Sequence, residues 1–134
     1  MSSLRLTTFI ALGFLSPAFA DEPIKFDPVW KGSVEDADLG KDAPTVLVSQ
    51  KALAAVWEKW KLEAKVPEVD FEKNFAVVVT SRGSVLNLGG SLKDDGDLAV
   101  LATSTRDIRP GFRYVIGVLP RGPKTVNGKP LPKE

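Results

Sequence analysis

Cysteine and histidine are absent from this sequence of 134 residues, and Met1 is its only methionine. Without cysteine the chain has no disulfide, no thiol nucleophile and no residue for a lipid anchor. Without histidine it has no Ser-His-Asp triad and no imidazole base. Zinc, copper and haem sites lose their usual ligands as well. We therefore predict no metal, no cofactor and no catalytic residues, and we expect a function other than that of an enzyme.

Long apolar runs are also missing, except within the first twenty residues, MSSLRLTTFIALGFLSPAFA. Arg5 gives this segment a basic start, LTTFIALGFL has the length of a signal-peptide core, and Ala18 to Ala20 supply the small residues that a signal peptidase reads. The run is shorter than the roughly 18 to 20 apolar residues that span a bilayer. We predict a secretory signal peptide at 1–20, one domain at 21–134 with no membrane span, and a secreted or periplasmic location.

An excess of charge of either sign is missing once this leader is removed. Loss of Arg5, one of 18 Lys and Arg residues, leaves 17 basic side chains against 17 acidic ones. A neutral domain lacks the long-range field that attracts an anionic polymer. The balance of charge therefore argues against a nucleic-acid partner.

Hydrophobic periodicity predicts one helix. Ser49 is placed to cap its N-terminus, and Leu53, Val56, Trp57 and Trp60 follow as one apolar stripe. We expect the helix to end before Pro67, because proline disfavours helical backbone in the residue before it. The stripe predicts that the tryptophans pack this helix on a sheet, and the alternative is that they stack on a ligand.

Runs of β-branched and alternating residues predict the strands. The expected strands are 29–34, 45–48, 75–81, 85–92, 98–105 and 112–119, with a last short pairing at 124–126. Short turns between consecutive strands favour antiparallel pairing. We therefore predict an α+β fold, in which a mainly antiparallel twisted sheet, open or partly closed into a barrel, is covered by one amphipathic helix.

Arginines gather in one stretch of the sequence. Arg106, Arg109 and Arg113 lie close together, and Arg82 joins them if the two loops share an end of the sheet. Guanidinium groups bind carboxylates and phosphates, and arginine and aromatic residues are enriched at interfaces. Our candidate binding residues are therefore Arg82, Arg106, Arg109, Arg113 and Tyr114. The alternative is a solvated loop in which the arginines pair with Asp107.

Acidic residues cluster at three places, and we predict turns at the first two. Asp94, Asp95 and Asp97 surround Gly96, but they lack the spacing of a calcium-binding loop. The acidic residues between Glu35 and Asp38 receive the same interpretation. The third cluster, Glu68, Asp70 and Glu72, would serve a carboxylate-based hydrolase only beside a sugar-binding cleft, for which so short a chain has little room.

Several motifs between Val46 and Val126 form a series. They are a strand VLVSQ leading into a helix with Leu53 and Trp57, the segment Val69-Asp70-Phe71, the apolar strand FAVVV, a glycine-containing strand near Gly89-Gly90, and a terminal strand FRYVIGVLPR. With this series of motifs the chain resembles the C-terminal domain of PrcB, a protease-complex accessory subunit. It resembles a small secreted bacterial protein of that type. The resemblance implies an accessory role and carries no catalytic residues.

These observations favour an exported, non-enzymatic module that binds another protein or a component of the cell envelope. Two alternatives stay open. One is a small-ligand carrier with a cavity between helix and sheet, lined by Trp57 and Trp60. The other is a hydrolase that uses carboxylates near Asp70.

Overall fold

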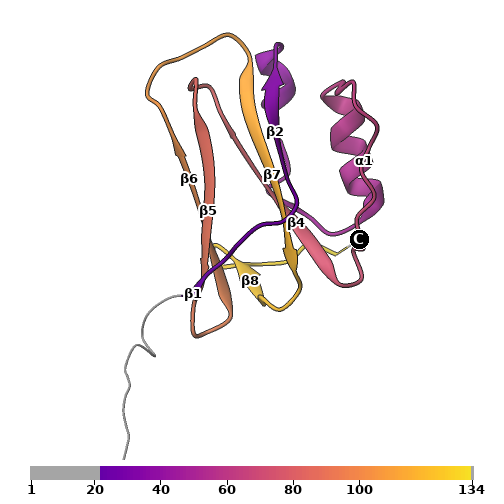
Figure 1. Ribbon diagram of the computed structural model, residues 1–134, viewed down its shortest axis with the longest axis vertical. Coiled ribbons are helices and arrows are strands. Elements are labelled where there is room, and N and C mark those ends of the chain that lie inside the picture. Colours follow the sequence, from indigo (N-terminus) through magenta and orange to yellow (C-terminus); the bar gives the residue numbers. More distant parts are fainter. Residues whose placement is uncertain (1–21, 134) are drawn as a thin grey trace, which may run out of the picture.

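The computed structural model describes residues 22–133, and the predicted signal peptide at 1–20 lies outside the described residues (Figure 1). Within this range the chain forms one α-helix, one 3-10 helix and nine strands. The helices are α1 (Gln50–Lys59) and η3 (Ala37–Gly40), and the strands are β1 (Glu22–Pro23), β2 (Val29–Val34), β3 (Val46–Leu47), β4 (Asn74–Ser81), β5 (Leu86–Leu92), β6 (Asp97–Ser104), β7 (Phe112–Pro120), β8 (Thr125–Val126) and β9 (Lys129–Pro130).

The strands form two sheets, so the prediction of one sheet is wrong. One sheet has four antiparallel strands in the order β2-β7-β4-β3. The other has five strands in the order β1-β5-β6-β8-β9, with β6 and β8 parallel and the other neighbours antiparallel. The α+β class and the predominance of antiparallel pairing are confirmed, but the sheets do not close into a barrel.

The two sheets and the helix make three layers, with the four-stranded sheet in the middle (Figure 1). The connections β4–β5 and β6–β7 each leave one sheet and enter the other. In the sequence each resembles the turn or loop of a hairpin. The expectation that consecutive strands pair fails at these two connections for that reason.

One core lies between α1 and the middle sheet. Its helix side is the predicted apolar stripe, and Leu53, Val56, Trp57 and Trp60 are all buried. They pack on alternate residues of β4 and β7, among them Val78 and Ile116. The predicted role of the tryptophans in packing the helix on a sheet is thus confirmed.

A second core lies between the two sheets. Phe75, Val77 and Leu119 leave the opposite face of β4 and β7 and pack with Leu98 of β6 and Val126 of β8. β4 and β7 are therefore buried on both faces along most of their length, which is why residues 75–79 and 115–119 are apolar without interruption.

Helix α1 begins as predicted and ends earlier than Pro67 requires. The Ser49 hydroxyl accepts a hydrogen bond from the Ala52 backbone N–H at 3.1 Å. Past the last helical turn, Lys61 adopts φ 57°, which takes the chain out of the helix. The indole N–H of Trp57 then donates to the Ala64 carbonyl at 2.7 Å and holds the following loop.

Candidate binding site

Two loops that cross between the sheets lie at one end of the molecule and carry the predicted arginines. The turn at 82–85 joins β4 to β5, and the loop at 105–111 joins β6 to β7. Backbone hydrogen bonds connect them, from the Arg109 N–H to the Arg82 carbonyl at 2.8 Å and from the Thr105 N–H to the Val85 carbonyl at 3.1 Å. The two loops thus share one end of the molecule, and Arg82 lies beside the loop of the other arginines, as the sequence suggested.

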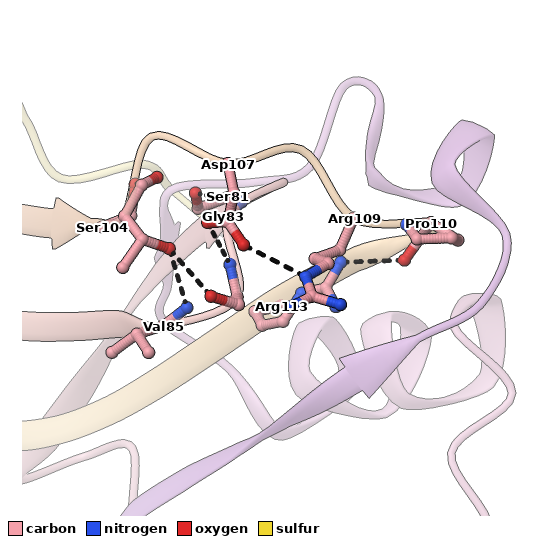
Figure 2. A network of polar contacts seen from close by, with 10 residues as sticks. Ser81, Gly83, Val85, Ser104, Asp107, Arg109, Pro110 and Arg113 are labelled. Atoms are coloured by element: carbon pink, nitrogen blue, oxygen red, sulfur yellow. Dashed lines mark hydrogen bonds and ion pairs between the residues drawn. The ribbon is translucent and has the colours of Figure 1, made fainter.

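Asp107 organises the contact between the loops (Figure 2). Its carboxylate accepts from the Ser84 backbone N–H at 3.1 Å and from Nε of Arg109 at 3.1 Å. The Thr105 hydroxyl, the backbone and hydroxyl of Ser84, and Arg109 together hold the pKa of Asp107 well below its usual range. The charged carboxylate therefore stabilises the ordered form of both loops.

Thr105 and Gly83 are the second point of contact. The Thr105 hydroxyl oxygen accepts from the Val85 N–H at 3.1 Å and lies 3.2 Å from the Ser84 hydroxyl. Gly83 lies so close to the Thr105 carbonyl that a side chain at this position would collide with it. The Ser81 hydroxyl also accepts from the Gly83 N–H at 3.0 Å. These contacts order the loops without covering them.

Exposed side chains from both loops define what we call the arginine face: Arg82, Arg106, Ile108 and Arg109. All four are exposed, and Ile108 is 75% exposed. Within residues 22–133, Arg109 pairs with Asp107, while neither Arg82 nor Arg106 takes part in an ion pair. The face is thus positively charged with an apolar residue between two arginines.

Arg113 is near the arginine face but differs from it in burial. It is half-buried on β7, where its Nη2 donates to the Pro110 carbonyl at 2.9 Å. Its Nε is buried and has no hydrogen-bond partner among the described residues. Arg113 therefore supports the loop from below, and Figure 2 shows its guanidinium beside Pro110.

Tyr114 does not join the arginines, although the sequence placed it among the candidate binding residues. It is buried, and its ring lies 5.2 Å from the ring of Trp60. Alternation along β7 directs Tyr114 toward the helix and Arg113 toward the other sheet. Burial raises the pKa of Tyr114, as expected for a phenol that packs in a core.

Sequence reasoning missed Ile108 and the roles of Thr105 and Gly83. Ile108 lies in a turn-rich stretch between charged residues, where an apolar side chain with no periodic partner is a signal of exposure. The close approach of Gly83 to Thr105 joins positions 22 residues apart, and no local pattern reveals it.

Two of the acidic clusters lie in turns, while the turn predicted at Glu35 to Asp38 is instead the start of the 3-10 helix η3. At the tip between β5 and β6, Gly96 adopts φ 88° and its N–H donates to the Lys93 carbonyl at 3.0 Å, which confirms the predicted hairpin turn. Asp36 caps η3 through the Asp38 N–H, and Asp70 accepts from the Glu72 N–H at 3.1 Å. Among the described residues, no three carboxylates gather closely enough to hold a metal ion.

Asp97 has a structural role that the sequence did not indicate. Its carboxylate accepts from the Thr125 hydroxyl at 2.6 Å and from the Gly128 N–H at 2.8 Å. Both hydrogen bonds lower the pKa of Asp97, and the one from Thr125 has the larger effect. The β8–β9 hairpin is thereby held against the start of β6.

Trp57 and Trp60 offer no face to a ligand. Trp57 and Trp60 are 5% and 2% exposed, and their rings meet Trp30 at 6.1 Å and Phe112 at 5.1 Å, edge to face. Their indole N–H groups donate to backbone carbonyls, as in Trp60 to Leu39 at 2.9 Å. This packing leaves the carrier hypothesis without the aromatic surface on which it depended.

Comparison with known proteins found no matching family model, no similar curated protein and no similar solved structure. The resemblance to the C-terminal domain of PrcB thus stays a prediction from sequence motifs. In the part of the chain that the structure describes, no helix has both the length and the apolar character needed to cross a membrane.

Proposed function

We propose that this chain is an exported, non-enzymatic module that binds an acidic surface of another protein or cell-envelope component through the arginine face. The observation that carries the proposal is an ordered loop that presents Ile108, 75% exposed, between Arg106 and Arg109. An exposed apolar side chain flanked by arginines has the composition of an interface centre.

The hydrogen bonds around Asp107 support binding as well as loop structure. They hold both loops in one conformation before a partner arrives, so less conformational entropy is lost on binding. They also engage the carboxylate of Asp107, the acidic group of the loop, with Ser84 and Arg109 and not with Arg82 or Arg106. The outward charge of Arg82 and Arg106 is therefore available for carboxylates or phosphates of the partner.

An accessory role is also what the resemblance to PrcB implies. A neutral domain with one local basic face suits this role, because the face selects an acidic partner while the whole molecule attracts no polyanion over long distances. The predicted signal peptide would deliver the domain to the cell envelope, where such a partner would lie.

The test is a triple variant, Arg82→Ala, Arg106→Ala and Arg109→Ala, used in cross-linking pull-downs from the native envelope. A matched control replaces three exposed lysines at the opposite end of the strands, Lys73 before β4, Lys93 after β5 and Lys124 before β8, and so removes the same charge. We expect the arginine variant to lose the captured partner, with affinity falling by at least about tenfold, and the lysine variant to retain it.

Salt provides a second readout, because contacts between exposed charges weaken as the screening length shortens. Capture by the native protein should fall with added salt, and Ile108→Ser should weaken it at every salt concentration. Equal capture by the arginine and lysine variants would remove the arginine face from consideration.

A further inference from the structure

Strand β6 has an outer edge that is paired over only part of its length. β8 pairs with β6 at Asp97 and Leu98, and no other described strand extends this pairing toward Ser104. β5 covers the opposite edge of β6 along its whole length. The backbone of β6 beyond Leu98 is therefore open on one side.

The hydrogen bonds near β8 show which backbone groups point outward. The Leu98 carbonyl accepts from the Asn127 N–H at 2.8 Å, and the Val100 N–H donates to Oδ1 of Asn127 at 2.8 Å. Because backbone direction alternates along a strand, the even-numbered residues direct their N–H and C=O groups to this edge. Asn127 thus satisfies Val100, and the N–H groups of Ala102 and Ser104 are the next donors that face outward.

A hollow of about 570 Å³ lies beside this open edge, between the two sheets. Val46, Val78 and Val79 of the four-stranded sheet line it on one side, and Val100, Ala102 and Val126 line it on the other. Its volume is that of a ligand-binding pocket, and most of its wall is apolar. The hollow opens here because β3 is only two residues long and leaves the end of β4 uncovered.

We propose that an extended peptide segment of a partner protein binds at this edge as an additional strand beside Val100–Ser104. Its backbone would bond to the outward groups of Ala102 and Ser104, and every second side chain would enter the apolar hollow beside Ala102. The peptide is therefore uncharged and apolar at alternate positions. This strand site shares no residue with the arginine face, although β6 runs directly into the loop that carries Arg106.

The sequence of β6 lacks the features that block strand addition. Residues 98–104, LAVLATS, contain no charged side chain and no proline, which are the residues that commonly protect an exposed edge. Leu101, 63% exposed on the outer face, would pack beside the side chains of the added strand that point away from the hollow.

A short peptide fits this edge better than a second copy of the chain. The open edge spans about five residues, or roughly 17 Å, and two such strands would cover far less than the roughly 1,200 Å² that stable interfaces bury. If a second copy paired at this edge, only its small side chains, Ala102 and Ser104, would enter the hollow and would fill it poorly. A partner peptide can instead supply side chains that fill it.

The test selects peptides from a phage-displayed library of linear random peptides and measures binding of the most enriched one, labelled with a fluorophore. In Ala102→Pro the outward N–H is lost, while pairing with β5 is kept because that N–H faces away from β5. Ala102→Lys places a charge at the hollow without changing the backbone. Asn87→Lys is the matched control, because Asn87 is exposed on β5, opposite Thr103 and on the far side of β6 from the open edge. Circular dichroism verifies that each variant is folded.

We expect enriched peptides to alternate apolar and polar residues, and both Ala102 variants to bind at least about tenfold more weakly while Asn87→Lys binds normally. The triple arginine variant should retain peptide binding. Loss of peptide binding in that variant would assign the peptides to the arginine face and overturn the strand site. Failure to enrich peptides, or equal binding by the Ala102 variants, would also overturn it. So would a dimer of the native protein that Ala102→Pro converts to a monomer, since a second copy would then occupy the edge.

Discussion

Gly83 is the residue at which the two loops come closest. The first atom of any side chain there would collide with the Thr105 carbonyl, so one of the loops must move. We predict that Gly83→Ala lowers the free energy of unfolding by about 1–3 kcal/mol, the usual range for overpacking. Urea denaturation measures this change.

Gly89→Ala is the control for that substitution. A side-chain atom at Gly89 meets the Leu101 carbonyl at 3.9 Å, which is an ordinary contact. Its free energy of unfolding should change by less than about 0.5 kcal/mol. Equal effects at the two glycines would mean that the close approach of the loops does not limit stability.

Asp107 makes the order of the loops dependent on pH. Its pKa is lowered in the folded protein, first by the Thr105 hydroxyl and then by Ser84 and Arg109, while an unfolded Asp titrates near about 3.9. The contribution of the carboxylate is therefore complete above about pH 4–5 and is lost as the pH falls toward the folded pKa. We predict that hydrogen exchange at the Ser84 amide, corrected for the intrinsic pH dependence, loses protection in that acid range.

Asp107→Asn is the control for the acid effect. Asparagine keeps a side-chain oxygen for the Ser84 N–H but removes the charge, so the protection of this amide should be lower and independent of pH. Acid-induced loss of protection that persists in the variant would assign the titration to another group.

At these residues the sequence predicted the arginine cluster but not its geometry. The spacing of Arg106, Arg109 and Arg113 placed them together, yet the alternation of β7 separates Tyr114 from them, because neighbouring residues of a strand face opposite sides. The alternative interpretation, in which the arginines pair with Asp107, holds for Arg109 alone among the described residues. Its hydrogen bond to Ser84, 23 residues away, depends on which loops share an end, and a sequence pattern does not contain that information.

At the scale of elements, helix α1 depends on its first turn. Ser49 is buried and its hydroxyl accepts from the Ala52 N–H, which would otherwise lack an intrahelical partner. We predict that Ser49→Ala lowers the free energy of unfolding by about 1 kcal/mol, a typical value for loss of an N-cap. Thermal unfolding followed by circular dichroism measures the effect.

Ser33→Ala serves as the reference for the N-cap, because Ser33 is exposed on β2 and caps no helix. The midpoint of thermal unfolding of Ser33→Ala should stay close to that of the native protein. An equal loss in both variants would show that the Ser49 hydroxyl contributes nothing specific to α1.

Elements with strong local patterns were predictable, and elements fixed by distant contacts were not. The stripe from Leu53 to Trp60 and the strands β2, β4 and β7 follow from periodicity and are confirmed. The parallel pairing of β8 with β6 depends on Asp97, whose carboxylate bonds to Thr125 and Gly128 some 28 and 31 residues away. The early end of α1 depends on Lys61, whose positive φ its sequence neighbourhood does not require.

At the scale of the molecule, two cores share the strands β4 and β7. The helix-side core contains Trp30, Trp57 and Trp60, and the core between the sheets contains Phe75 and Leu98. The sequence showed that β4 is apolar on both faces, which requires a layer on each side. It did not show that the second layer is another sheet, because short turns within one sheet and crossings between sheets use the same residue types.

This sharing of strands predicts that the two cores unfold together. Phe75 is fully buried between the sheets, on the face of β4 away from the tryptophans. We predict that Phe75→Ala lowers the free energy of unfolding by about 3–5 kcal/mol, as expected for truncation of a buried phenylalanine. Because all three tryptophans lie in the other core, their fluorescence reports whether the damage crosses β4.

The measurement is urea unfolding followed by tryptophan fluorescence and by far-ultraviolet circular dichroism. Coincident transitions that shift together would show one cooperative unit, because the loss of packing on one face of β4 and β7 then removes the support of the other face. A fluorescence transition that keeps its native midpoint while circular dichroism shows an earlier step would contradict this prediction. The helix and the middle sheet would then be stable without the second sheet, and the loops of the arginine face, which join the two sheets, would be ordered only when both are folded.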